Sequence, residues 1–229
     1  MIEIRRSNER GPADHGWLQS RHTFSFAGYY DRKHMGVSAL RVINDDRVSP
    51  GRGFDTHSHQ DMEIISYVKK GRIEHKDSMG NVEKLPAGEF QLMSAGTGVT
   101  HSEYNPSTTE ALEFLQIWIE PDTHGIEPGY QQKRFDTKQG LQLIASADGR
   151  DGSLHIHQDV SLYQLRLNKD ESASLALAPG RTLYVHVVSG AISVNGETLN
   201  EGDGGTISEC DTVNFNGIEC SESLVFDLP

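Results

Sequence analysis

The stretch GRGFDTHSHQDMEIISYVKKG, residues 51–71, places two histidines one residue apart, just before a β-branched run that ends at a glycine. Successive side chains of a strand point to opposite faces, so His57 and His59 face the same way. Neutral imidazole nitrogens are good ligands for zinc, iron, copper or nickel. The pair supplies half of a metal site, although two histidines alone are more simply hydrogen-bonded or exposed strand residues. We expect the flanking Asp55 and Asp61 to be solvated or bonded to backbone.

The second half of a site lies in AGTGVTHSEYN, residues 95–105. His101 and Glu103 are again two residues apart, so they also share a face of a strand. Three imidazoles and one carboxylate leave open positions on a five- or six-coordinate metal, which is typical of catalytic rather than structural sites. The paired motifs therefore predict one metal ion held by His57, His59, His101 and Glu103.

The rest of the chain predicts an all-β protein. Short β-branched or aromatic runs such as VSALRVIND, LEFLQIWIE and TLYVHVVSG alternate with Gly, Asn, Asp and Pro breaks. Runs of this length, with turn residues between them, are typical of antiparallel strands. No long segment shows a clear helical period. A barrel or a sandwich follows.

A faint internal repeat divides the sequence. The segment 120–132 is rich in Pro and Gly and is the best candidate for a domain boundary. YVKKG at 67–71 aligns with HVVSG at 186–190, and both end a strand at a glycine. At the same offset the HSH of residues 57–59 falls on ALA at 176–178. Two copies of one barrel are the simplest explanation, with the polar cluster kept in the first copy alone.

Composition excludes several classes of protein. The chain of 229 residues carries a formal net charge of −12, which disfavours binding to nucleic acid. The N-terminus lacks the pattern of a signal peptide, and no apolar run is long enough to span a bilayer. Cys210 and Cys220 are too few for a disulfide scaffold and fit a reducing compartment. We expect a soluble, cytoplasmic monomer with no membrane partner.

Two motifs resemble those of the cupin superfamily. Residues 51–71 resemble the first cupin motif, and GNVEKLPAG at 80–88 followed by HSEYN at 101–105 resembles the second. The long gap between these two pieces is similar to that of the pirin family, as are several further stretches. These are RHTFSFAGYYD at 21–31, LRVINDDRVSPGRGF at 40–54, IEHKDSMGN at 73–81, QLMSAGTGVTHSEYN at 91–105 and PGYQQKRF at 128–135.

The resemblance implies a bicupin, two cupin-type antiparallel β-barrels packed together in one chain. We expect an N-terminal metal-binding domain over residues 1–125 and a C-terminal cupin-like domain without metal ligands over residues 126–229. General cupins use the glutamate of the first motif as a ligand, whereas pirins use that of the second. We therefore assign the role to Glu103 and expect Glu63 behind the ligands, where it would fix a histidine tautomer. Iron is the metal that the resemblance implies, with zinc, copper, nickel, cobalt or manganese as alternatives.

Pirin-like bacterial proteins are associated with quercetin 2,3-dioxygenase activity. The resemblance thus implies a small apolar aromatic substrate, the flavonol quercetin, which reacts with O2 to give a depside and carbon monoxide. Glu103 would take the proton of the 3-hydroxyl group. The flat substrate would need apolar walls, for which the candidates are Phe24, Phe26, Tyr67 and Met93. One alternative is a metal- or redox-sensing regulator that binds a protein partner, and another is a cupin reaction on a small polar metabolite.

The remaining histidines suggest ordinary structural roles. We expect a hydrogen bond between His75 and Asp77 within a hairpin, and a capping role for His22. The second H-x-H pair, His155 and His157, has no downstream partner pair and is assigned no metal role.

Overall fold

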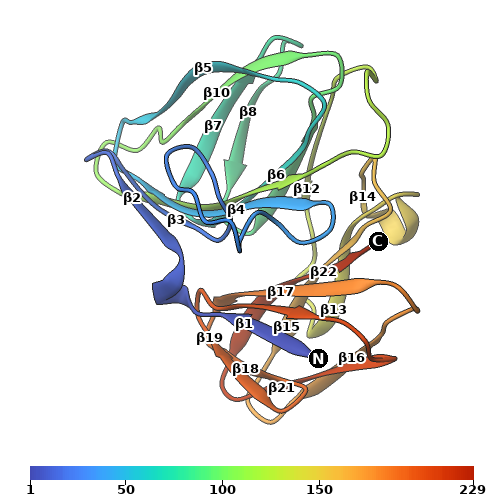
Figure 1. Cartoon of the computed structure of the whole chain (residues 1–229). Coiled ribbons are helices and arrows are strands. Elements are labelled where there is room, and N and C mark those ends of the chain that lie inside the picture. The colour runs from blue at the N-terminus through green and yellow to red at the C-terminus, as the bar shows by residue number, and fades with distance from the viewer. The chain divides into compact units, whose positions relative to one another are not determined.

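The computed structural model describes residues 1–229 and contains 22 strands and two short 3-10 helices, η1 (Ser7–Glu9) and η2 (Arg150–Gly152) (Figure 1). The chain forms two compact units. The N-terminal unit comprises residues 11–135 and 156–158, and the C-terminal unit comprises residues 1–10, 136–155 and 159–229. None of the helices is long or apolar enough to cross a membrane. The predicted all-β class is confirmed.

The N-terminal unit is a barrel of two antiparallel sheets. The seven-stranded sheet has the order β12 (Gly129–Arg134), β9 (Glu89–Ser94), β6 (Glu63–Lys70), β11 (Leu112–Ile119), β4 (Leu40–Val48), β3 (Leu18–His22) and β2 (Gly11–Asp14). The four-stranded sheet has the order β5 (Gly53–His59), β10 (Val99–Tyr104), β7 (Arg72–Asp77) and β8 (Val82–Pro86).

The C-terminal unit is built in the same way. Its seven-stranded sheet has the order β1 (Ile2–Arg5), β20 (Gly204–Ile207), β17 (Thr182–Ser189), β22 (Ser221–Leu228), β15 (Ser161–Leu167), β13 (Gly140–Ser146) and β14 (Leu154–His155). Its four-stranded sheet has the order β16 (Ser172–Ala176), β21 (Thr212–Gly217), β18 (Ala191–Val194) and β19 (Glu197–Asn200).

The two strand orders correspond position by position, which confirms the internal repeat. The central strands β9-β6-β11-β4 of one unit match β20-β17-β22-β15 of the other, and β5-β10-β7-β8 match β16-β21-β18-β19. The aligned glycines both follow a matching strand, β6 or β17, and both have positive φ, +82° at Gly71 and +73° at Gly190. A Cβ atom at Gly190 would lie 2.2 Å from the carbonyl oxygen of Cys220, so only glycine fits this turn.

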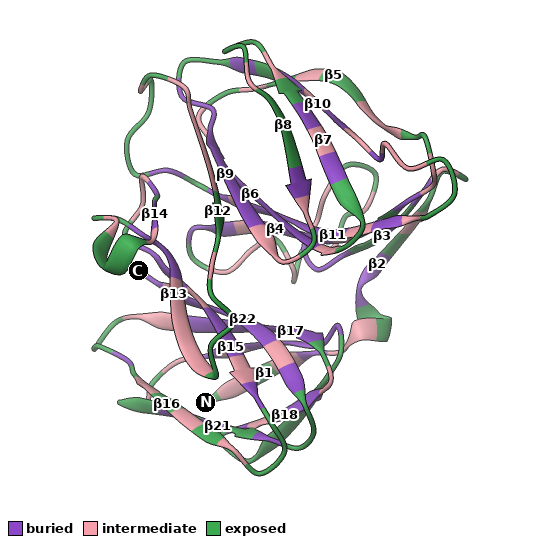
Figure 2. Cartoon of the chain, turned by 180° about the vertical axis from the view of Figure 1, so that it is seen from behind, coloured by how far each residue is buried: buried purple, intermediate pink, exposed green.

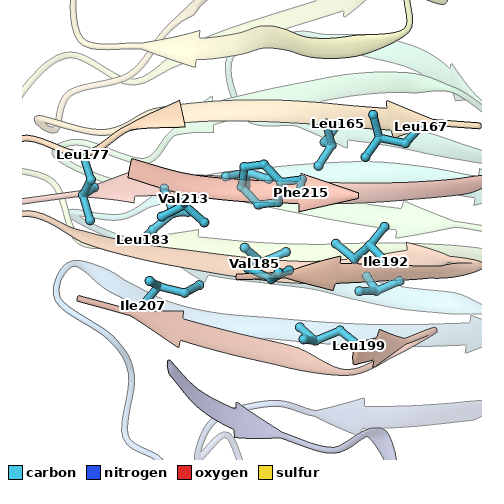
Figure 3. Packing of buried hydrophobic residues seen from close by; sticks show 13 residues of the cluster. Leu165, Leu167, Leu177, Leu183, Val185, Ile192, Leu199, Ile207, Val213 and Phe215 are labelled. Carbon is cyan, nitrogen blue, oxygen red and sulfur yellow. The ribbon is translucent and has the colours of Figure 1, made fainter. Parts of the chain in front are cut away.

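The interiors of the two barrels differ in chemistry. The C-terminal barrel is filled by a single apolar cluster, whose residues converge from both sheets (Figure 3). Where β5 carries His57 paired with His101, the matching strand β16 carries Ala176 paired with Thr212. Burying each aliphatic side chain contributes roughly 1.5–3 kcal/mol to the stability of this barrel.

The N-terminal barrel instead has two separate apolar clusters. Both are buried between the sheets, as the purple segments of β6, β9 and β11 indicate (Figure 2). One cluster contains Val68 and Phe114, and the other contains Ile64 and Met93. The strand positions between them carry the polar side chains of the candidate site.

The compact units differ from the predicted domain ranges at three places, one of which is the short segment 156–158, which belongs to the N-terminal unit. Strand β12 pairs with β9, so the N-terminal unit continues past residue 125 to Phe135. Strand β1 pairs with β20, so the first ten residues belong to the C-terminal unit. The Pro- and Gly-rich segment 120–132 therefore leads into the edge strand β12 and does not separate the two units. The pairing of the edge strand β1 joins segments that lie far apart in the sequence.

Candidate metal centre

Three histidines meet on the inner face of the four-stranded sheet. His57 and His59 lie on β5, and His101 lies directly opposite His57 on β10. The ring centroids are 4.8 Å apart for His57 and His59, 4.5 Å for His57 and His101, and 4.9 Å for His59 and His101. One nitrogen of each ring lies within 4.8 Å of the others. The structure therefore brings together the three imidazoles that the spacing predicted.

The geometry of these nitrogens fits a bound metal. Nε2 of His59 lies 3.0 Å from Nε2 of His101. Two imidazoles on one ion, each at about 2.0–2.1 Å, have their nitrogens at a similar separation when the ligands are adjacent. Burial, followed by the neighbouring imidazoles, lowers the pKa of His59 to about 4 and that of His101 to about 3. Both rings are thus neutral at pH 7, which is the form that binds a metal.

The tautomer of His57 is set by its own strand. Its Nδ1 donates a hydrogen bond of 2.7 Å to the backbone carbonyl of Asp55, which leaves the lone pair on Nε2. The Asp55 carboxylate accepts a hydrogen bond from the hydroxyl of Tyr104. Asp55 therefore supports the site through its backbone while its side chain bonds elsewhere.

Glu103 is buried beside His101 and is held from the opposite sheet. Its Oε1 accepts a hydrogen bond of 3.1 Å from Ser66 Oγ, and its Oε2 accepts one of 3.0 Å from Gln116 Nε2. A carboxylate oxygen lies within 4.8 Å of ligand nitrogens of His101 and His75. His101 thus stands between the other two imidazoles of the predicted set and the carboxylate.

His75 also belongs to this cluster, which its sequence position did not reveal. The predicted hydrogen bond is present: Nε2 donates to the Asp77 carboxylate over 3.0 Å, and both side chains are fully buried. The His75 ring lies 5.3 Å from that of His101 and 4.8 Å from that of Tyr130. The Nδ1 atoms of His75 and His101 are both buried and have no hydrogen-bond partner. The carboxylate therefore fixes a tautomer of His75 whose lone pair lies beside a predicted metal ligand.

A polar row crosses the seven-stranded sheet beneath Glu103. His22, Asn44, Gln116, Ser66 and Gln91 occupy directly opposed positions on the five adjacent strands β3, β4, β11, β6 and β9. Within this row, Nδ1 of His22 and Oδ1 of Asn44 are 2.7 Å apart. The capping role predicted for His22 is wrong, because strand pairing turns this side chain into the barrel, where it lines a cavity.

That cavity has a volume of about 510 Å³ and is lined by His57 and His59. Its apolar walls are Trp17, Phe26, Phe54 and Trp118. The Trp118 ring contacts His59 edge-on at 5.0 Å and Phe26 at 5.3 Å. A flat aromatic molecule fits such walls, because aromatic faces and edges attract one another.

Only one of the four predicted wall residues, Phe26, lines this cavity. Phe24 is buried outside it. Tyr67 lies on the opposite face of β6 from Ser66 and stacks on Phe90 at 4.4 Å. Met93 packs in the apolar cluster beyond the histidines. Of the two tryptophans in the walls, Trp118 lies on β11 and its inward orientation depends on strand register, whereas Trp17 lies in the bend before β3.

Glu63 lies outside the cluster. It begins β6, and its carboxylate accepts a hydrogen bond of 3.0 Å from Ser94 Oγ and lies 3.3 Å from Nδ1 of His157. The expected position of Glu63 behind the metal ligands is wrong, because the chain turns at Asp61, where φ is +48°. The Asp61 carboxylate accepts a hydrogen bond of 2.7 Å from the backbone N–H of Gly125, which is the bond to backbone expected for this residue.

Comparison with known proteins agrees with this architecture. The family model described as Pirin matches residues 3–119, and the model described as Quercetinase C-terminal cupin domain matches residues 143–228. The quercetin 2,3-dioxygenase of Escherichia coli K12 is 55% identical over 229 residues, covering 100% of this chain and 99% of that protein.

Two crystal structures of the Escherichia coli protein YhhW are also similar. One superposes with a TM-score of 0.99 at 55% identity and covers 100% of this chain and 98% of the other. The second is the bacterial pirin YhhW in complex with nickel(II), with a TM-score of 0.98, 54% identity and coverage of 100% and 99%. The family model matches more than half of the chain, and the identity extends over its whole length. The chain therefore belongs to the pirin family.

Proposed function

We propose that this protein is a metal-dependent dioxygenase that cleaves the flavonol quercetin with O2 to a depside and carbon monoxide. One observation carries the proposal: the ligand nitrogens of His57, His59 and His101 lie within 4.8 Å of one another, and His57 and His59 line a cavity of about 510 Å³ with aromatic walls. Glu103 lies beside His101, within the same distance of its ligand nitrogen. A related enzyme of Escherichia coli bears the name quercetin 2,3-dioxygenase, which supports the choice of substrate.

The residues that would hold the metal are His57, His59, His101 and Glu103. Three neutral imidazoles and a carboxylate suit a divalent transition metal, and we propose iron. Zinc, copper, nickel, cobalt or manganese would also be accepted by such a donor set, and the nickel complex of the Escherichia coli pirin supports this tolerance. A bound ion of this kind supplies Lewis acidity towards a chelating substrate and a centre for chemistry with O2.

The chain itself binds, orients and deprotonates the substrate. The rings of Trp17 and Phe54 cover a flat molecule and keep water from it. Glu103 takes the proton of the 3-hydroxyl group, because its carboxylate stands beside His101. Ser66 and Gln116 each donate a hydrogen bond to that carboxylate and hold it in place. In the overall reaction both oxygen atoms of O2 enter the depside, and carbon 3 of the flavonol leaves as carbon monoxide.

Turnover is tested on protein reconstituted with a defined metal. We expect the visible absorbance of quercetin to fall under O2 with one carbon monoxide released per flavonol, and no change under argon. His101→Ala should abolish turnover, whereas His155→Ala, at an exposed histidine of the C-terminal unit, should retain it. Loss of absorbance without carbon monoxide would contradict this ring opening.

A regulatory role is distinguished by a second measurement. A pull-down with metal-loaded and metal-free protein that recovers a stoichiometric, metal-dependent protein partner, with no turnover of quercetin, would favour regulation over catalysis.

Both cysteines are unpaired, which supports a reducing compartment such as the cytoplasm as the place of action.

A further inference from the structure

A buried carboxylate in the wall of the cavity has an open hydrogen-bonding position. Asp46 lies on β4, is 2% exposed and lines the same cavity as His57 and His59. The Ser20 hydroxyl donates a hydrogen bond to its carboxylate. Its Oδ1 atom is buried and has no partner. Leaving a buried acceptor without a hydrogen bond is unfavourable, and more so when the group is charged, so this oxygen is a candidate to bind a ligand.

The strand register places this carboxylate near the candidate metal site. Asp46 lies two residues along β4 from Asn44, on the same face, at roughly 7 Å. Asn44 is directly opposite Gln116, the residue that donates to Glu103. Asp46 and Glu103 also interact electrostatically. One molecule in the cavity can therefore reach the ligands with one edge and Asp46 with another.

The electrostatics of Asp46 suit binding to a hydroxyl group. Burial raises the pKa of Asp46 to about 7, the bond from Ser20 lowers it, and the charges of Asp45 and Glu103 raise it further. Near neutral pH the carboxyl group exists in both protonation states, so it can accept a hydrogen bond from a phenol or donate one. The polar side chains of His22, Asn44 and Gln116 also line this cavity.

We propose that Asp46 binds a hydroxyl group on the edge of the substrate remote from Glu103, and so selects planar aromatics with several hydroxyl groups. The inference rests on the proposed function for the orientation of the substrate. The cavity then rejects aromatics whose single hydroxyl group is used at the metal. This determinant gives a role to polar residues that line the cavity together with its aromatic walls.

The test is a double-mutant cycle between the protein and the ligand. Dissociation constants are measured by equilibrium dialysis without O2, on zinc-loaded protein, for quercetin and for 3-hydroxyflavone, which has the 3-hydroxyl group alone. In the wild type we expect quercetin to bind roughly tenfold more tightly than 3-hydroxyflavone, because one hydrogen bond to a charged group raises affinity by about that factor. In Asp46→Ala the two ligands should bind within about twofold of each other.

The matched control is Asp45→Asn. Asp45 is the next residue of β4, faces the other side of the sheet and forms an ion pair of 3.0 Å with Lys69. This variant should keep the tenfold preference. An unchanged preference in Asp46→Ala would overturn the inference. Should that variant not fold, the wild type is tested against flavonols that each lack one hydroxyl group: loss of affinity at one position supports the inference, and no loss at any position overturns it.

Because the readout is binding, it separates the two proposals. Preference for quercetin that depends on Asp46, without any release of carbon monoxide, would support the determinant and reject the dioxygenase. If Asp46→Ala turns over quercetin and keeps the wild-type preference for quercetin over 3-hydroxyflavone, the dioxygenase is supported and the role of Asp46 is rejected.

Discussion

Nε2 of Gln116 lies 3.0 Å from Oε2 of Glu103, and the two residues come from strands of different sheets. The amide therefore spans the barrel interior to hold a carboxylate that belongs to the opposite wall. Ser66 donates to the other oxygen of the same carboxylate over 3.1 Å. The seven-stranded sheet thus orients the one acidic member of the candidate metal site.

Replacing this amide should impair turnover more than metal binding. Gln116→Leu removes one of two donors to Glu103, so the carboxylate is less well placed to take a proton. Loss of a partner that orients a ligand usually reduces activity about 10–100-fold, and we expect such a decrease in kcat with near-complete metal occupancy. Gln139→Leu, at an exposed loop residue, is the control. Wild-type kcat in Gln116→Leu would show that the bond is incidental.

Removing the carboxylate behind His75 should weaken metal retention. Asp77→Asn can no longer impose an N–H on Nε2 of His75, so the ring beside His101 loses its fixed tautomer. We expect roughly tenfold weaker metal affinity, measured by competition with a chromogenic chelator. Glu83→Gln, at an exposed residue of β8, should match the wild type. If the affinities of wild type and Asp77→Asn agree, His75 serves packing alone.

The free energy of unfolding of the metal-free protein should depend on pH through the titration of Asp46. Its pKa is about 7 in the folded protein and near 3.8 in the unfolded chain, so the folded state binds more protons between these values. Its contribution to stability is present in full below pH 3.8 and is lost as the pH rises to 7, by at most about 4 kcal/mol. Asp46→Asn should therefore gain stability relative to the wild type between pH 5 and pH 8. Urea denaturation at both pH values checks this, and a constant difference would refute it.

Glu63→Gln should leave the metal site intact. This carboxylate bonds Ser94 and His157 and stands apart from the cluster. We expect a lower free energy of unfolding by about 1–3 kcal/mol, because a buried charged acceptor is lost. The metal content of the purified variant should equal that of the wild type. A substoichiometric metal content would indicate instead that Glu63 is a ligand, as in general cupins.

The sequence contained enough to predict the histidines and the repeat. His57, His59 and His101 lie on short strands whose two-residue spacing fixes which side chains share a face, and the same spacing places Glu103. The repeat was detectable because both barrels need a glycine with positive φ after the same strand.

Apart from Phe26, the walls and supports of the site could not be predicted. Trp118, Gln116 and Asp46 face inward because of the register between β11 and β4, and one residue of slip would turn each of them outward. The position of Glu63 behind the ligands was wrong, because side chains alternate regularly only within one strand and a turn at Asp61 separates Glu63 from His59. The edge strands β1 and β12 pair with segments that no local pattern identifies.

The most direct measurement is anomalous diffraction from a crystal of metal-loaded protein. The account predicts a single peak within about 2.0–2.2 Å of one nitrogen each from His57, His59 and His101 and of a Glu103 oxygen. A principal peak at Glu63 and His157, or one that contacts fewer than three of the four predicted ligands, would contradict it.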